Sequence, residues 1–490
     1  MSVSYRRSDL DLVIPKYSMI RDCIEGQSAV KYKRSEYLPI PNSEDTSGDN
    51  QSRYEAYLTR AVFYGVTGRT LRGLVGQIFL RDPIYVIPPL LNILEFDTNG
   101  EGLDLIQLSK KICTYVMAYG RCGIFIDYPS TSESTSRQDL LDGSIRPIIK
   151  VYEPWNIINW RTVVVGAQKL LSLVVLKEEY DIEDDGFETV TDIQWRVIRL
   201  TGDGCIVEIW RDTSNGREIV SSYRLCDHTG DEMHEIPFRF TGSETNDSEI
   251  DAPPMYDMSI LNIAHYRNSA DYEESCFITG QPTLWISGLN ETWWEDVLNK
   301  QVRMGSRGAI PLPSEAEAGL LQSLPNIMPF EAMAHKERQM VAIGAKLIEQ
   351  RNIERTATET EIEFASDNSV LTTVSKNAST NILWALQRAA SFAGTEPTSI
   401  EFELNSNFDI TAMTSEELRI MVETWMNGAL AFSEIRTALK RSNLAVLTDE
   451  DAIAEIEKYK DLIVQNQPMQ KMEEPGNDDE DEDENEDTEN

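Results

Sequence analysis

Acidic side chains are the residues of this sequence best suited to chemistry, because paired carboxylates can act as general acid and base or hold a divalent cation. Closely spaced acidic groups occur at 359–363 and at 449–451. The chain has 82 acidic residues, however, so close pairs are expected by chance and carry little weight. A hydrolase that uses Glu359 and Glu361 with a metal ion is the enzyme alternative that the sequence leaves open.

Histidine and cysteine, the common metal ligands and nucleophiles, are few and scattered. His234-Glu235 lacks the second histidine of a zinc-binding HExxH helix, and no histidine lies at ligand spacing to a cysteine. We therefore expect surface or interface histidines, and free thiols in a reducing compartment. The residues concerned are His228, His234, His265 and His335, and Cys23, Cys113, Cys122, Cys205, Cys226 and Cys276.

Sequence motifs for binding calcium or phosphate are incomplete. Asp97-x-Asn99-x-Glu101 resembles the start of an EF-hand loop, but its twelfth position is Leu108 instead of the required glutamate. Residues 65–70 have the wrong spacing and no lysine for a P-loop, and neither a GxGxxG after a strand nor a GxSxG occurs. We expect no catalytic, cofactor-binding or metal-binding residues, and a protein that is not an enzyme.

The charge of the chain restricts its possible partners. The formal net charge is −37, and 12 of the negative charges lie in residues 473–490, which contain no Lys or Arg, so the rest carries −25. Proteins that hold DNA tightly cluster Lys and Arg to replace counterions, and this sequence has no such cluster. DNA is then either not a partner or one that slides past without sticking. Trp155, Trp160 and Trp293-Trp294 could stack on single strands, but without interleaved basic residues we expect core or interface packing.

Apolar stretches are too short to cross a membrane. The densest one, 170–176, compares with the roughly 18 residues that a spanning helix needs. Residues 1–10 carry two arginines with no apolar segment behind them, so we expect no signal peptide. A length of 490 residues predicts about three domains.

The periodicity of apolar residues predicts helices in the first quarter of the chain and strands in the second. Leu71, Leu74, Val75 and Ile78 share a helical face, as do Tyr54, Leu58, Ala61 and Val62, and a further helix is expected over 105–119 with Gly120 as its cap. Alternation predicts strands at 124–126, 148–151, 171–175, 195–198 and 206–210. Surface loops are expected at 130–136 and in the acidic stretch 178–186.

Two long helices are expected around a compact insert. The first covers 255–279 and stops at Gly280; the second opens at Pro329 and continues to about Arg351. A polar segment without apolar period follows at 354–361. After it we expect a helix over 367–392, a strand over 400–404, and a helical cluster that opens with the capping box 414–417. The acidic tail is expected to be disordered.

Several segments resemble the phage portal protein family, specifically its branch with a portal-like domain of otherwise unassigned sequence. They cover most of residues 50 to 400. The most specific is the run Asn262-x-x-His265-Tyr266-Arg267-x-Ser269-x-Asp271-Tyr272. The matching segments are 54–79, 97–103, 119–129, 261–283 and 356–359.

The resemblance implies an α+β, mainly helical subunit with the portal arrangement of parts. Its C-terminal cluster is short for the family, and the acidic tail has no counterpart there. The implied parts are a wing at 1–252 (helical, then β-rich), a first stem helix at 253–279, a small β-containing clip at 280–328, a second stem helix at 329–352, a tunnel loop at 353–366, a wing return with a long helix at 367–410, a helical crown at 411–472 and a disordered acidic tail at 473–490.

The resemblance also implies a function. Portal subunits form a dodecameric ring at the capsid vertex of the virion, assembled in the host cytoplasm, and double-stranded DNA passes through it during packaging and ejection without sequence-specific binding. The implied partners are further copies of the chain, the large terminase subunit, a head–tail adaptor or tail protein, and the major capsid and scaffold proteins. No cofactor and no membrane are implied.

Three groups of residues are candidates for this role. We expect the small residues of the second stem helix to let neighbouring helices approach closely, and an acidic channel to let DNA slide. Whether Arg351 and Arg355 contact phosphates or pair with Glu354 and Glu359 is open. The candidates are Met340, Ala342, Gly344, Ala345 and Leu347 for stem packing, Arg351, Arg355, Thr356, Thr358 and Glu359 for the tunnel loop, and Lys300, Arg303 and Arg307 for exposed clip positions.

Two other classes of protein are weighed against this interpretation. One is a structural adaptor that binds other virion proteins through its Trp-rich segments. The other is the carboxylate–metal hydrolase, which needs a concave, dry pocket. A ring with a central hole is expected of the portal alone.

Overall fold

The structure is a computed structural model. It describes all residues except 1–2, 129–145, 185, 215, 228, 282, 303–309, 322–325, 348–368, 407, 409–414 and 428–430, and beyond 431 it describes only 435–436, 439, 452–456 and 458. The chain divides into two compact units, Met1–Phe408 and Asp409–Asn490. Both helices and strands are present and helices predominate, so the fold class is α+β, as predicted.

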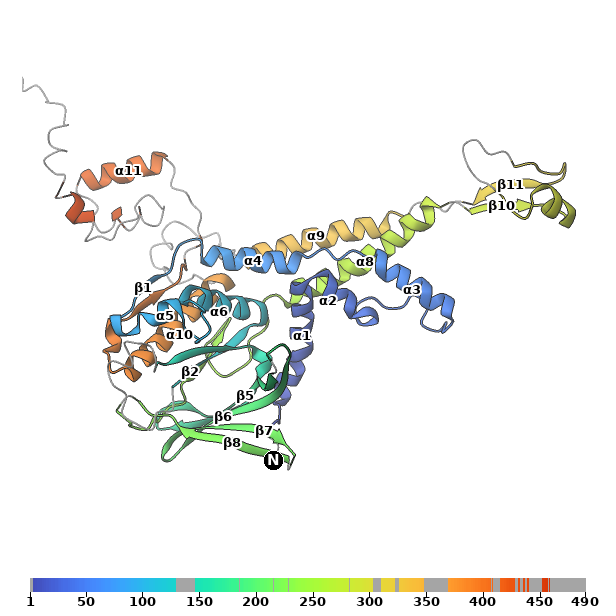
Figure 1. Ribbon diagram of the computed structural model, residues 1–490. Coiled ribbons are helices and arrows are strands. Elements are labelled where there is room, and N and C mark those ends of the chain that lie inside the picture. Colours follow the sequence, from blue (N-terminus) through green and yellow to red (C-terminus); the bar gives the residue numbers. More distant parts are fainter. Residues whose placement is uncertain are drawn as a thin grey trace, which may run out of the picture. The chain divides into compact units, whose positions relative to one another are not determined.

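Along the chain, helices α1 to α6 precede strands β2 to β9, and helices α8, α9 and α10 follow them (Figure 1). The second unit contains α11, Ser415–Met426, where the capping box predicted a helix start. The helices of the first unit are α1 (Ser8–Glu25), α2 (Gln27–Tyr32), α3 (Gly48–Arg60), α4 (Val66–Ile78), α5 (Ile93–Phe96), α6 (Leu105–Tyr119), α8 (Tyr256–Gly280), α9 (Met328–Lys346) and α10 (Val370–Phe392), with short turns η1 (Arg34–Glu36), η2 (Pro89–Leu91), η3 (Pro154–Asn156), η4 (Trp293–Val297) and η5 (Pro397–Ser399).

The strands that the structure describes in the first unit form four antiparallel sheets. Their orders are β1-β12, β10-β11, β3-β2-β9 and β4-β5-β6-β7-β8. The strands are β1 (Ile84–Val86), β2 (Arg121–Asp127), β3 (Ile148–Tyr152), β4 (Ile157–Val165), β5 (Gln168–Asp184), β6 (Thr189–Thr201), β7 (Gly204–Thr213), β8 (Gly216–Arg224), β9 (Phe238–Gly242), β10 (Thr283–Ser287), β11 (Glu317–Leu321) and β12 (Glu401–Glu403).

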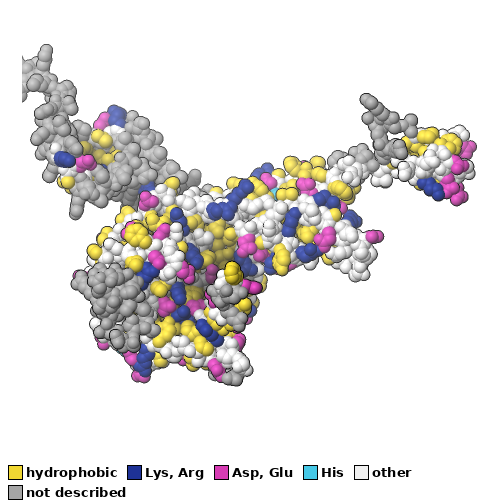
Figure 2. Space-filling view, in the orientation of Figure 1, with side chains coloured by type: hydrophobic (Ala, Val, Ile, Leu, Met, Phe, Trp, Pro, Cys, Tyr) yellow, Lys and Arg dark blue, Asp and Glu magenta, His cyan; other side chains and the backbone are white. Residues whose placement is uncertain are grey.

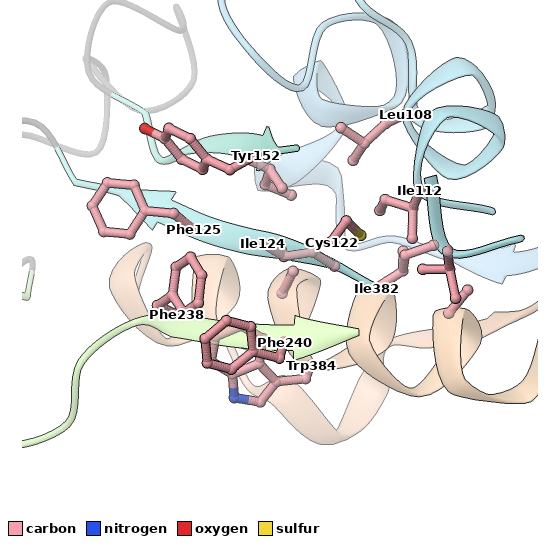
Figure 3. Close-up of a cluster of buried hydrophobic side chains, with 14 of the residues drawn as sticks. Leu108, Ile112, Cys122, Ile124, Phe125, Tyr152, Phe238, Phe240, Ile382 and Trp384 are labelled. Atoms are coloured by element: carbon pink, nitrogen blue, oxygen red, sulfur yellow. The ribbon is translucent and has the colours of Figure 1, made fainter. Parts of the chain in front are cut away.

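The core of the first unit lies around the three-stranded sheet. Strand β2 is buried along almost its whole length, and α6 and α10 both pack on it (Figure 3). A Cβ atom at Gly123 would overlap the Phe238 ring and Ile157, so the close approach of β9 requires glycine there. Gly120 caps α6 in the left-handed conformation, φ 82°, as predicted.

Two sequence predictions about secondary structure are wrong. The acidic stretch 178–186 is not a loop through most of its length, because β5 continues to Asp184 and pairs with β6. Ala61 and Val62 do not belong to a helix: α3 ends at Arg60, and the backbone N–H of Val62 donates to the Ser269 hydroxyl. In both places a tertiary contact overrides the local pattern.

Arg196 links the two larger sheets. Its guanidinium on β6 donates to Glu178 on β5 (2.8 Å) and to Asp127 on β2 (3.2 Å), and it is 8% exposed. Burial raises the pKa of Glu178, but the Arg196 guanidinium, the Tyr152 hydroxyl and Lys150 together lower it more, so the net pKa is below its ordinary value. The charges are therefore paired, which a buried position requires.

Replacing Arg196 with methionine is expected to destabilise the fold by about 3–5 kcal/mol, because Glu178 and Asp127 lose their buried partner. Urea unfolding measures the change. The matched control is Arg199→Met on the same strand, whose 47% exposed side chain pairs with Glu208 at 3.5 Å and is expected to contribute less than about 1 kcal/mol. Equal losses in the two variants would contradict the role given to Arg196.

Candidate functional site

Helices α8 and α9 are the two long helices that the sequence predicted around an insert. The helix expected over 255–279 is observed at Tyr256–Gly280, and the helix expected from Pro329 begins at Met328. Lys336 donates to Asn268 and the Tyr272 and Phe330 rings lie 6.0 Å apart, so the helices pack antiparallel. In sequence they flank the insert that contains the β10-β11 hairpin, which follows the end of α8 and precedes the start of α9 (Figure 1).

Asn262 anchors the first half of α8 to the non-helical segment between α3 and α4 and to the first turn of α4. Its carbonyl oxygen accepts from the backbone N–H (3.2 Å) and the hydroxyl (2.9 Å) of Thr67, and its amide donates to the carbonyl of Tyr64 (2.7 Å). Asn262 and Thr67 are both 0% exposed. Each of these buried polar groups therefore has the partner that burial demands.

The next turns of α8 hold the segments around α3. The Ser269 hydroxyl accepts from the N–H of Val62 at 2.9 Å, and Arg267 donates to the carbonyl of Tyr37 at 2.7 Å. These bonds satisfy backbone groups at places where no helix or strand ladder does so. They explain why the chain can leave α3 at Arg60 without losing hydrogen bonds.

The second half of α8 binds α3 through charged groups. The Tyr57 hydroxyl donates to Asp271 at 2.6 Å, and Arg60 pairs with Glu274. Burial, together with the hydrogen bond to the Asp271 carboxylate, raises the pKa of Tyr57. The Tyr57 hydroxyl therefore stays protonated and keeps donating at neutral pH.

His265 is a residue of α8 whose side chain faces α9. Its Nε2 atom is 3.2 Å from Glu337 on α9, its ring is 5.7 Å from the Tyr64 ring, and its Nδ1 atom is buried without a hydrogen-bond partner. His265 therefore lies at an interface between two helices of the chain, one of the two kinds of position expected for the histidines. His234 and His335 are exposed, and His228 lies outside the described residues.

The polar residues of the run 262–272 thus face other segments of the same chain. Tyr266, between them, is 0% exposed with its ring 6.1 Å from Phe63. Sequence reasoning recognised this run but missed the residues that it binds, Tyr37, Val62 and Thr67 among them. The sequence signal that could have indicated these partners is the row of polar residues along one face of a helix that is buried, because buried polar residues need hydrogen-bond partners.

The predicted stem-packing residues of α9 divide between its two faces. Met340 and Leu347 are buried in their own chain, and a Cβ atom at Gly344 would lie 3.5 Å from both Met258 and Thr70. Ala342 and Ala345 are exposed, on the side where Val341 is 71% exposed. Apolar side chains are visible along α9 in Figure 2.

Of the three predicted clip residues in the insert, the structure describes Lys300. Lys300 is exposed and pairs with Glu295 at 2.6 Å, with φ 58°. Arg303 and Arg307 lie outside the described residues. The same holds for the tunnel-loop candidates Arg351, Arg355, Thr356, Thr358 and Glu359, and for Glu361 of the enzyme alternative.

Geometry argues against calcium binding at Asp97 and against stacking at Trp160, whereas Trp294 is 38% exposed. The Asp97 carboxylate accepts from the N–H groups of Gly100 and Gly102 and pairs with Arg146, so protein donors occupy it. Within the described ranges no cluster of three or more His, Cys, Asp or Glu could hold a metal ion. Trp160 packs in the core at 2% exposure. Searched over the same residues, no helix has the length and apolar character of a membrane span.

A family model described as a domain of unknown function, DUF4055, matches residues 254–393. This segment runs from the start of α8 to the end of α10. It is less than half of the chain. No curated protein matches the sequence.

Three solved structures of gene transfer agent (GTA) particles contain chains with a similar arrangement. The chain in the virion of the native particle has a TM-score of 0.39 and 14% identity, over 76% of this chain and 89% of that one. The neck of the empty particle, computed with C6 symmetry, gives 0.42 and 14%, over 76% and 90%. The neck of the native particle, computed with C12 symmetry, gives 0.40 and 13%, over 76% and 89%.

Asn262→Ala is expected to lower the free energy of unfolding by about 2–4 kcal/mol, because it leaves the backbone N–H and the hydroxyl of the buried Thr67 without their acceptor. The control is Asn268→Ala, six positions further along α8, which loses only the bond to Lys336 and should cost less than about 1 kcal/mol. Chemical denaturation of both variants compares them. A cost for Asn262→Ala no larger than that of the control would show that the anchor is unimportant.

Gly344→Ala is expected to leave stability unchanged or raise it by up to about 1 kcal/mol, since alanine favours the helix and the added methyl group fits at ordinary contact distance. Gly344→Leu should cost about 1–3 kcal/mol, because Met258 and Thr70 must move. Thermal unfolding of the two variants tests this. Marked destabilisation by alanine would mean that α9 packs more closely on α4 and α8 than described.

Proposed function

We propose that the chain is a subunit of a ring-shaped portal, the head–tail connector through which double-stranded DNA enters and leaves a phage capsid. The observation that carries the proposal is the contrast between the two helices. Helix α8 is bound to its own chain through most of its polar residues, whereas α9 leaves much of its apolar surface exposed. A second copy of the chain supplies the missing contact.

The exposed surface of α9 has the composition of an interface. Met328, Phe330 and Val341 are 66%, 54% and 71% exposed, and Ala342 and Ala345 are exposed among them. Val341 and Ala345 lie one turn apart on the same face of α9. Exposed apolar groups mark interaction sites in soluble proteins, and small residues let helices approach closely. A contact between this face and a different face of the next copy is head-to-tail, and head-to-tail contacts close into rings.

Charge supports a channel that DNA passes without binding. The net charge of −37 per chain gives a ring a strongly negative potential, which repels phosphate and prevents tight, sequence-independent binding. In this proposal the ring is a dodecamer at the capsid vertex. The insert between α8 and α9 faces the large terminase subunit and later the adaptor or tail protein.

The proposal assigns no chemistry to the chain. Its work is mechanical and positional: α8 and α9 support the channel, and the body contacts the capsid and scaffold proteins. Catalysis of packaging then belongs to the motor that docks on the ring.

Val341→Glu is expected to abolish ring formation, because it places an unpaired charge in the apolar contact, while the stability of the single subunit stays the same. Negative-stain microscopy and light scattering of the purified full chain at about 0.15 M salt measure assembly. The control is Val220→Glu on β8, where the valine is 47% exposed and lies outside both α9 and the β4 edge. It should leave the rings intact.

A wild-type protein without rings would overturn the portal proposal. A small oligomer without a central hole would favour the structural adaptor instead. Rings that survive Val341→Glu would show that α9 is not the contact.

A further inference from the structure

Strand β4 leaves half of its outer edge open. It is the terminal strand of the five-stranded sheet, and residues 161–165 are all exposed. Val163, Val164 and Val165 are 40%, 71% and 56% exposed. Natural sheets protect such edges with charges, proline or a covering segment. Arg161 is the one charge in the open half, and the run Thr162 to Val165 contains neither charge nor proline.

The other half of the same edge is covered by the N-terminal segment. The backbone N–H of Arg7 donates to the carbonyl of Ile158 (3.1 Å), and its guanidinium donates to the carbonyl of Trp160 (3.1 Å). Because backbone groups alternate along a strand, the N–H and C=O groups of Thr162 and Val164 point to this same edge. Among the described residues, the N-terminal segment thus covers the edge as far as Trp160, and no backbone hydrogen bond reaches Thr162 or Val164 from another segment across this edge.

A groove of about 670 Å³ borders the open edge. Thr162 of β4 lies in its wall, opposite residues of β9 and α10. Lys169, Arg239 and Arg388 line it together with Glu235 and Asp247, so cations exceed carboxylates in a chain whose net charge is −37.

Arg239 is the cation best placed to receive an anion there. Its guanidinium lies 4.5 Å from the centre of the Trp384 ring, and in the described part of the chain no carboxylate is within ion-pair distance of it. Burial lowers the pKa of Arg239, and the nearby Glu235 carboxylate offsets this only in part. Arg388, by contrast, is already paired with Glu235.

The occupant must match both the edge and the groove. An open strand edge accepts another extended backbone, and alternate side chains of an added strand point to opposite faces. Carboxylates at every second position would reach Lys169 and Arg239, and the positions between them would lie beside Val163. A phosphate backbone has no N–H donors for the carbonyls of Thr162 and Val164, so nucleic acid fits the open edge less well than a peptide.

We propose that the open edge of β4 binds an extended segment of a partner protein, with acidic side chains alternating with β-branched ones, by strand addition. Main-chain hydrogen bonds to Thr162 and Val164 supply affinity. Lys169 and Arg239 supply the preference for acidic residues. This site is separate from α9, so it does not depend on ring formation.

The test uses the full chain and a labelled peptide of alternating valine and glutamate, with fluorescence anisotropy as the readout. We expect Arg239→Ala to weaken binding about tenfold and Val164→Pro to weaken it at least as much, because proline removes an N–H donor. Proline is tolerated on an edge strand whose N–H faces solvent, so Val164→Pro should fold. Arg224→Ala, an exposed arginine on β8 paired with Glu232, is the matched control and should bind as the wild type does.

Three further probes separate the possible occupants. A peptide with N-methyl groups on its outward amides and a valine–lysine peptide should both bind at least about tenfold more weakly. Equal binding of the N-methylated peptide, unchanged binding by both Val164→Pro and Arg239→Ala, or no binding of the valine–glutamate peptide would overturn the proposal. Preferential binding of oligothymidylate would also overturn it and would make the occupant a nucleic acid. Loss of self-association in Val164→Pro with peptide binding intact would overturn it as well and would make the occupant a second copy of the chain.

Discussion

The need to satisfy buried polar groups along α8 organises much of the first unit. A helix with a purely apolar inner face can slide or rotate against its neighbours at little cost, whereas a buried amide or hydroxyl without a partner costs about 1–3 kcal/mol. Asn262 and Ser269 each bind a backbone group from a different segment. They determine where α3 ends, where α4 begins and how both lie on α8. The break between α3 and α4 follows from these bonds, since the local sequence there has no strong helix stop.

The same constraint explains the contrast between α8 and α9. Most polar residues of α8 are bound within the chain, which fixes this helix to the body. Helix α9 contacts α8 through Phe330, Lys336 and Glu337, and it leaves Val341, Ala342 and Ala345 exposed. One helix that is firmly anchored and one that offers apolar surface are the two components that a subunit needs to position a neighbour without deforming itself. The β10-β11 hairpin lies between them in sequence, so its position depends on both.

The two larger sheets depend on a different interaction, the ion pairs of Arg196. They join β2 to β5 and β6 where side chains from both sheets meet in a buried environment. Such a network specifies relative orientation, because charges that lose their partners there are strongly disfavoured. The first half of β4 also joins the sheets, since the Trp160 ring lies 5.3 Å from the Phe240 ring of β9, whereas its second half, residues 161–165, is exposed. The open half of its edge is consequently free to serve a partner.

The amino-acid sequence alone determined most elements of regular structure, the two long helices around an insert and the α+β class, because these follow from apolar periodicity and from local stop signals such as Gly120 and Gly280. It also indicated which run of α8 mattered. Tertiary structure alone decided what that run binds, why the acidic stretch of β5 is a strand, and that Gly344 contacts Met258 and Thr70 of its own chain. It alone brought Lys169, Arg239 and Arg388 to one groove, although they are far apart in a sequence without a basic cluster. The reason is physical: periodicity reports which face of an element is buried, but the partner of a buried polar group, and the charges that gather around a groove, depend on contacts between residues that are distant in the chain.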